Sequence, residues 1–294
     1  MSAGAATEPA PRSVPQGSPV ARALRRLLRN RAFVVGAALV ILLALAAIFA
    51  DWIAPADPFR NNFRTRLRPP DATFWFGTDH FGRDILSRVI HGARISLLIG
   101  FCTAVLTGIA GTVIGATAGY FPRLDNPLMR VMDAMMAFPS ILLAIAIAAV
   151  LGASVVNVII ALSVATTPHT ARIVRASVLT LREREFVEAV RAFGAGDTRI
   201  LALHIVPNAF GPLIVRLTYV FATAILAEAA LSFIGVGPPP PAPSFGSIIA
   251  QGRDFIVDAP WITIFPGVAI MIAVLGLNLL GDGLRDVLDP RMRV

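Results

Sequence analysis

The feature of this sequence that most limits its fold is a run of 38 residues, 134–171, without a single formally charged side chain. As one helix the run would be about 57 Å long, because each residue of an α-helix adds about 1.5 Å. The hydrocarbon core of a membrane is only about 30 Å thick. We therefore expect the chain to turn back at residues 151–154 and to cross a membrane twice as a helical hairpin.

Composition agrees with a membrane location for the whole chain. Of the 294 residues 56% are hydrophobic and 15% are charged, with a mean hydropathy of +0.72, whereas soluble domains have about 25% charged residues. All 26 basic residues are arginine. The absence of lysine excludes P-loop ATPases and Schiff-base enzymes, which require one. The fold class predicted is an all-α membrane protein.

The order of apolar and polar segments predicts six transmembrane helices. Residues 1–31 form a Pro-rich and then Arg-rich tail that we expect to be disordered and cytoplasmic, and residues 32–50 are the first span. Residues 51–93 are a polar extracytoplasmic segment that ends in a short interfacial helix, for which an ordinary amphipathic packing helix is the alternative. The remaining part, 94–294, contains five further spans.

Arginine positions predict the orientation. An even number of spans puts both termini on one side, and 17 arginines fall on that side against seven on the other. Cytoplasmic loops carry the excess of basic residues, so both termini are expected in the cytoplasm. Because the arginines lie at the edges of apolar runs, they predict no nucleic-acid partner. The expected environment of the chain is the lipid bilayer.

Glycines recur at every fourth position in the second predicted span, at Gly111, Gly115 and Gly119. This spacing leaves one face of a helix without side chains, which permits close packing of another helix. The pattern does not distinguish a contact within the chain from a contact with another subunit.

A short amphipathic helix is predicted at residues 182–193, between two spans. Phe186, Val190 and Phe193 form one apolar stripe on it and the opposite face is charged. Gly194 and Gly196 end the helix, and Asp197 is placed to cap a second one. We expect this apolar stripe to be buried, either against a partner protein or against the membrane or this chain's own loops.

These residues resemble a known motif. Glu188-Ala189-Val190, Gly194 and the segment 205–207 (Ile-Val-Pro) are similar to the cytoplasmic EAA motif in permease subunits of binding-protein-dependent ABC importers. Val190 and Val206 replace the more common alanine and leucine. Further segments resemble the C-type permeases of dipeptide and oligopeptide importers: 77–79, 82–84, 92–97, 137–140, 181–185, 227–233 and 278–286.

The resemblance implies a type I ABC importer permease fold in the bacterial cytoplasmic (inner) membrane, without enzymatic activity or cofactor. The partners implied are a second permease, two ABC ATPase subunits, an extracytoplasmic solute-binding protein and a peptide substrate. Nickel or another small solute is the alternative substrate. The helix at about 182–197 would dock on the ATPase, through Arg184, Glu185, Phe186, Val187, Glu188, Ala189, Val190, Phe193 and Gly194.

Two charged residues lie inside the fifth predicted span. Glu228 and Arg216 are twelve residues apart, about 18 Å along a helix, and therefore cannot form an ion pair. Charged groups at membrane depth are costly and often functional. Glu228 is therefore a candidate for the translocation path, with a structural contact to a neighbouring helix as the alternative. Arg216 is expected to extend toward the inner membrane surface.

Two other classes of protein fit the sequence less well. An ion-coupled secondary transporter also has several spans, but it would not account for the cytoplasmic helix pair. An intramembrane enzyme is disfavoured because the sequence contains neither H-E-x-x-H nor G-x-S-x-G, and its four histidines lack metal-ligand spacing. No metal site is expected.

Overall fold

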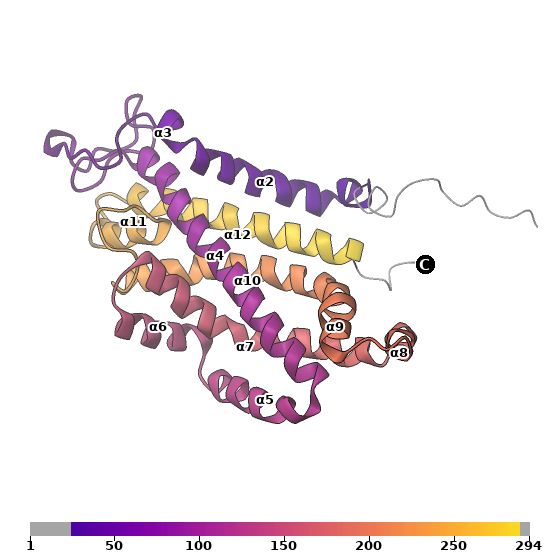
Figure 1. Ribbon diagram of the computed structural model, residues 1–294. Helices are drawn as coiled ribbons and strands as arrows, with labels where there is room; N and C mark the ends of the chain where they lie inside the picture. Colours follow the sequence, from indigo (N-terminus) through magenta and orange to yellow (C-terminus); the bar gives the residue numbers. More distant parts are fainter. Residues whose placement is uncertain (1–24, 289–294) are drawn as a thin grey trace, which may run out of the picture.

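The computed structural model describes residues 25–288, and this part of the chain is helical with no strand. Most of the predicted tail, residues 1–24, lies outside the described residues. Long helices run side by side along one axis (Figure 1). The start of α2 (Arg31–Ile48), the end of α12 (Trp261–Leu288) and α8 (Glu185–Ala192) lie at one end, named here the α8 end. The opposite end carries α3 (Ala50–Ile53) and α11 (Phe245–Gly252), and is named the α11 end.

Helix α2 occupies the place of the first predicted span and packs antiparallel to α12 (Figure 1). The Asn30 side chain caps α2 by accepting a hydrogen bond from the backbone N–H of Phe33 at 3.1 Å. A Cβ atom on Gly36 would overlap the α12 backbone at Leu280. Glycine therefore permits direct contact between the two helix backbones.

The separate interfacial helix predicted before the second span is absent. Residues 85–120 form one 36-residue helix, α4 (Ile85–Tyr120), about 54 Å long. The Asp84 carboxylate starts it by accepting from the Ser87 N–H at 2.7 Å. Ser87 and Arg88 of its first turns are buried against the preceding loop, which fits the alternative of an ordinary amphipathic packing helix.

The polar segment 54–84 folds over the α11 end around Asp79. The Asp79 carboxylate accepts from the backbone N–H groups of Phe81 and Arg83 at 2.8 and 2.9 Å, and it pairs with the Arg83 guanidinium at 2.7 Å. The Gln251 side chain of α11 accepts from both Arg83 and Arg88, at 2.8 and 3.2 Å. The motifs at 77–79 and 82–84 therefore fasten this segment to α4 and α11.

The glycine stripe of α4 packs within the chain, against α7 (Val155–Arg182). Cβ atoms on Gly111 and Gly119 would approach Thr170 and Val178 of α7 to 2.7 and 2.9 Å, and one on Gly115 would overlap the carbonyl oxygen of Ala171. Of the two alternatives that the glycine spacing left open, the structure therefore shows a contact within the chain.

The predicted turn at residues 151–154 is present. Gly152 has a φ of +87°, and Ser154 caps α7. The segment before it differs from the prediction, because α5 (Pro122–Met136) and α6 (Ser140–Leu151) are bent by 88° at the Phe138-Pro139 step. Proline disfavours helical conformation in the residue before it. At twelve residues, about 18 Å, α6 alone is too short to cross a membrane.

Among residues 25–288, four helical segments are long and apolar enough to cross a membrane: α2, α4, residues 197–233 and α12. The bent pair of α5 and α6 would count as a fifth. Helix α7 has sufficient length, about 42 Å, but Thr166, Thr167, His169 and Thr170 lower its hydropathy. Six spans, and their orientation, stay predictions.

We expect Gly115→Ala to destabilise the protein, because its methyl group would overlap the α7 backbone. The expected loss is about 1–3 kcal/mol, measured by thermal unfolding of the purified protein in detergent. Gly267→Ala in α12 is the matched control, since a Cβ atom there meets no atom within 4 Å. Equal unfolding temperatures for the two variants would contradict the close packing.

Candidate functional site: an exposed helix and a pocket

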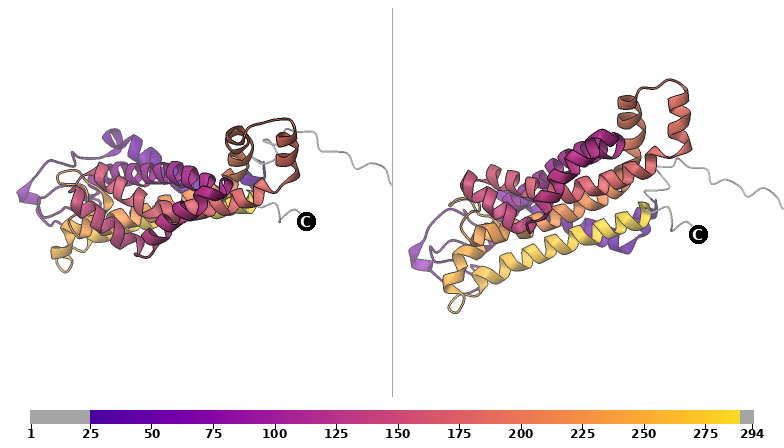
Figure 2. Two further views of the ribbon diagram at one scale, coloured as in Figure 1. Left: turned by 60° about the horizontal axis from the view of Figure 1, so that its bottom comes forward. Right: turned by 90° about the horizontal axis from the view of Figure 1, so that it is seen from below.

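Helix α8 is shorter than predicted. Helix α7 continues to Arg182, and α8 begins only at Glu185. At the other end the predicted glycine stop is present, since Gly194 has a φ of +82°. This conformation favours glycine because a Cβ atom is strained there. Figure 2 shows α8 and α9 (Asp197–Ile200) projecting as a pair beyond the other helices.

One face of α8 packs against its own chain. Val187 is fully buried, and Val190 is half-buried in the same cluster, which includes Ile200, Ile205 and Leu213. The prediction that Val187 and Val190 contact a partner therefore differs from their position in the structure. Both residues hold α8 onto the bundle.

The rest of the surface of α8 and of its C-terminal cap is open to solvent. Phe193 is 90% exposed and Phe186 is 38% exposed. We name this surface the exposed face of α8; the other predicted contact residues on it are also exposed, namely Arg184, Glu185, Glu188, Ala189 and Gly194. It combines aromatic rings with acidic side chains and carries no side chain at Gly194. Exposed aromatic residues of this kind are typical of protein interfaces.

Tyr120, at the end of α4, holds the α8 and α9 pair in place. Its hydroxyl donates to the Asp197 carboxylate at 2.6 Å and accepts from the Arg191 guanidinium at 3.4 Å. The second bond raises the pKa of Arg191, which stays a cation. Asp197 therefore does not cap α9 as predicted. It is the first residue of that helix, and Gly196 occupies the capping position.

Helix α9 continues without a break into α10 (Phe210–Phe233). The connection is a widened π-helical turn at residues 201–205 followed by a tighter turn at 206–209. Pro207 lies in this connection and lacks the N–H group that a regular helix requires. A displacement of α8 would therefore reach α10 through continuous helical backbone.

Glu228 of α10 is fully buried among three serine hydroxyls. Its carboxylate accepts from Ser232 and Ser244, each at 2.7 Å, and from Ser96 at 3.2 Å. Ser96 belongs to α4, and Ser244 caps α11. The structure thus does not place Glu228 on an open path, as had been predicted as one alternative, but in a cluster that joins α4, α10 and α11.

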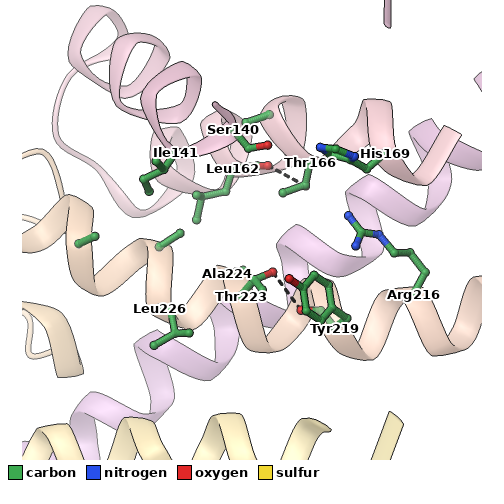
Figure 3. A pocket seen from close by; sticks show the side chains of 13 residues that line it. Ser140, Ile141, Leu162, Thr166, His169, Arg216, Tyr219, Thr223, Ala224 and Leu226 are labelled. Atoms are coloured by element: carbon green, nitrogen blue, oxygen red, sulfur yellow. Dashed lines mark hydrogen bonds between the residues drawn. The ribbon is translucent and has the colours of Figure 1, made fainter. Parts of the chain in front are cut away.

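A pocket of about 470 Å³ lies between α6, α7 and α10 (Figure 3). Its lining is mainly apolar, with a group of polar side chains that Figure 3 shows along α7 and α10. The polar lining residues are Ser140, Thr166, His169, Arg216, Tyr219 and Thr223.

Arg216 is aimed into this pocket and not toward the membrane surface, as had been predicted. Figure 3 shows its guanidinium facing His169 across the pocket. Its Cζ atom lies 5.1 Å from the centre of the Tyr219 ring, and its Nε atom is buried without a hydrogen-bond partner. The pocket was not predicted from the sequence. Its signal was the spacing of residues 216, 219 and 223, which share one helical face in an apolar span.

We expect Glu228→Leu to destabilise the protein much more than Glu228→Gln. Leucine removes the acceptor of three buried hydroxyl groups, at about 1–3 kcal/mol for each that finds no other partner, whereas glutamine keeps a carbonyl oxygen. Thermal unfolding measures the difference. If Glu228→Gln unfolds like the wild type but transports solute at least tenfold more slowly per folded molecule, Glu228 belongs to the translocation path.

Comparisons with known proteins agree on one family. Residues 111–294 match the family described as "Binding-protein-dependent transport system inner membrane component", and residues 18–70 match the "N-terminal TM domain of oligopeptide transport permease C". A putative peptide transport system permease protein of Brucella suis biovar 1 is 56% identical, over 94% of each chain. The dipeptide transport system permease protein DppC of Alkalihalophilus pseudofirmus is 46% identical, over 94% of this chain and 91% of its own.

A solved structure supports the fold. The inward-facing MetNI methionine ABC transporter contains a chain with a TM-score of 0.59 and 20% identity, over 69% of this chain and 97% of that one. The protein therefore has the type I ABC permease fold and is a multi-pass protein of the bacterial inner membrane. It belongs to the family of inner membrane components of binding-protein-dependent transport systems.

Proposed function

We propose that this chain is a permease subunit of an ATP-driven importer and forms half of a path for peptides across the inner membrane. The relatives support a peptide substrate, since they are named as permeases for peptides, dipeptides, D,D-dipeptides and glutathione, which is itself a tripeptide. The other components proposed are a second permease, two ATPase subunits and an extracytoplasmic solute-binding protein. Nickel or another small solute stays the alternative substrate.

ATP hydrolysis takes place on a separate chain in this proposal. The sequence has no lysine and therefore no P-loop lysine of its own. The observation that carries the proposal is the exposed face of α8, where Phe193 is 90% exposed although the other face of the same helix is buried. An ATPase subunit is the partner that would cover it.

The geometry supports a mechanical route from the ATPase to the membrane helices. Movement of a docked α8 is transmitted through Val187 to the cluster with Ile200 and Ile205, and along the backbone into α10. Helix α10 lines the pocket. Binding energy at α8 would thereby favour one of two arrangements of the path, which is the requirement for coupling.

The orientation proposed places the α8 end in the cytoplasm. The arginine distribution supports it, since 17 of the 26 arginines lie in the two chain ends and the segments 123–130 and 172–199, which are assigned to this side. Segment 54–84 and α11 then face the opposite side, where a binding protein would deliver substrate. An ion-coupled transporter would have no use for an exposed α8, so that reading is less well supported.

We expect Phe193→Ala and Glu188→Arg each to weaken association with the ATPase, and uptake of a labelled dipeptide, by at least about tenfold. The first removes an aromatic contact of the kind that dominates interfaces, and the second reverses a charge. Copurification and uptake in cells measure the two effects. Phe63→Ala is the control for association, because Phe63 is 67% exposed at the α11 end. Undiminished association and uptake would contradict the role of α8.

Thiol labelling tests the orientation. In a Cys102→Ala background we expect Arg191→Cys to react with an impermeant reagent only from the cytoplasm. Val257→Cys, at an 88% exposed position before α12, should react only from outside the cell. Labelling of both cysteines from the same side would refute the proposed topology.

A further inference from the structure

We propose that the pocket between α6, α7 and α10 binds the terminal carboxylate of the transported peptide, with Arg216 as its principal contact. This inference rests on the proposed function and adds the part of the substrate that the permease recognises. The contrast between the two charged residues of α10 supports it.

Within the described residues, Arg216 has no partner for its charge. No ion pair among residues 25–288 includes it, and no acidic side chain lines the pocket. Glu228, the other charge of α10, is held by three serines and is twelve residues away. A guanidinium inside a membrane protein is costly unless an anion or hydrogen-bond acceptors satisfy it. The pocket is therefore positively charged and lacks a counterion, which an anionic ligand would supply.

The donors and acceptors around Arg216 match the end of a peptide. Arg216 offers free N–H groups, and the His169 ring across the pocket makes no hydrogen bond within the described part of the chain. The Thr223 hydroxyl donates to the backbone oxygen of Tyr219 at 2.9 Å, so its oxygen remains available as an acceptor for a peptide N–H group. The Thr166 hydroxyl donates to the Leu162 oxygen and accepts from the Thr107 hydroxyl, each at 2.8 Å, so it is already engaged on both sides.

The apolar part of the pocket suits varied side chains. Ile141, Leu162 and Leu226 belong to its lining, and its volume of about 470 Å³ is within the range of small-molecule sites. A planar guanidinium binds a carboxylate through two parallel hydrogen bonds. The site would thus recognise the one group that all unmodified peptides share and would tolerate different residues.

A phosphate of a membrane lipid has similar anionic chemistry. The structure favours the substrate, because the guanidinium is directed between α7 and α10 toward His169 and its Nε atom is buried (Figure 3). An arginine that extends to lipid headgroups would instead point along the helix to the membrane surface.

The proposal is tested by measuring how well a peptide protects a cysteine in the pocket from a thiol reagent. The sample is the complete transporter in nanodiscs without the binding protein, so that the permease alone discriminates between peptides. The background is Cys102→Ala with Ala227→Cys, a lining position without a polar role. The probes are alanyl-alanine and its C-terminal amide. We expect the free acid to protect the thiol at a concentration about ten- to hundredfold lower than the amide requires.

Arg216→Gln should abolish this preference for the acid, and Arg216→Lys should keep part of it, because lysine retains the charge without the planar fork. Arg175→Gln is the matched control, since Arg175 of α7 pairs with Asp125 and does not line the pocket. It should leave the preference unchanged.

Three results would overturn the inference: equal protection by acid and amide in the wild type, a preference that survives Arg216→Gln, or protection by added phosphatidylglycerol but not by peptide. The last result would assign the site to a lipid phosphate. Failure of the proposed function is a separate outcome. It would appear as a complete wild-type transporter, with its binding protein, that shows no ATP-dependent uptake of any peptide.

Discussion

The close contact between α4 and α7 is the interaction on which the rest of the structure depends. Lipid gives helices no hydrophobic reason to associate, so packing at short distance must hold them together. Gly111, Gly115 and Gly119 allow this along about two turns of α4. The contact positions α7, which forms one wall of the pocket and leads at its end into α8. A side chain at Gly115 would therefore disturb both parts of the candidate site.

The two charged residues of α10 show how the same helix serves two purposes. Glu228 is fully satisfied by hydroxyl groups from three helices or their caps, and so it fixes their relative positions. Arg216 faces a pocket without an anionic neighbour. A buried charge with complete hydrogen bonding stabilises one arrangement, whereas a charge that lacks a partner leaves interaction energy for a ligand. This difference separates a structural role from a binding role.

Particular elements show where sequence reasoning succeeded and where it failed. That the chain turns back within residues 134–171 followed from the length of the run, and the glycine end of α8 followed from backbone sterics. The bend of 88° before α6 was not predicted, because hydropathy does not register it. The interfacial alternative failed because Ser87 and Arg88 bond to residues distant in sequence: Ser87 accepts from the Ala56 N–H, and Arg88 donates to Gln251. Val187 and Val190 were assigned to a partner because a helical stripe does not reveal what covers it.

The sequence by itself determined that the chain is a helical membrane protein without a P-loop lysine, and it located the amphipathic helix with its glycine stop. These properties depend on local composition and on periodicity, which hydropathy and backbone sterics decide within a few turns. Only the tertiary structure decided which face of α8 is free, that the α4 glycines meet α7, and that Arg216 faces His169. Each of these depends on contacts between helices far apart in the chain, and side-chain burial there is set by packing that no local pattern specifies.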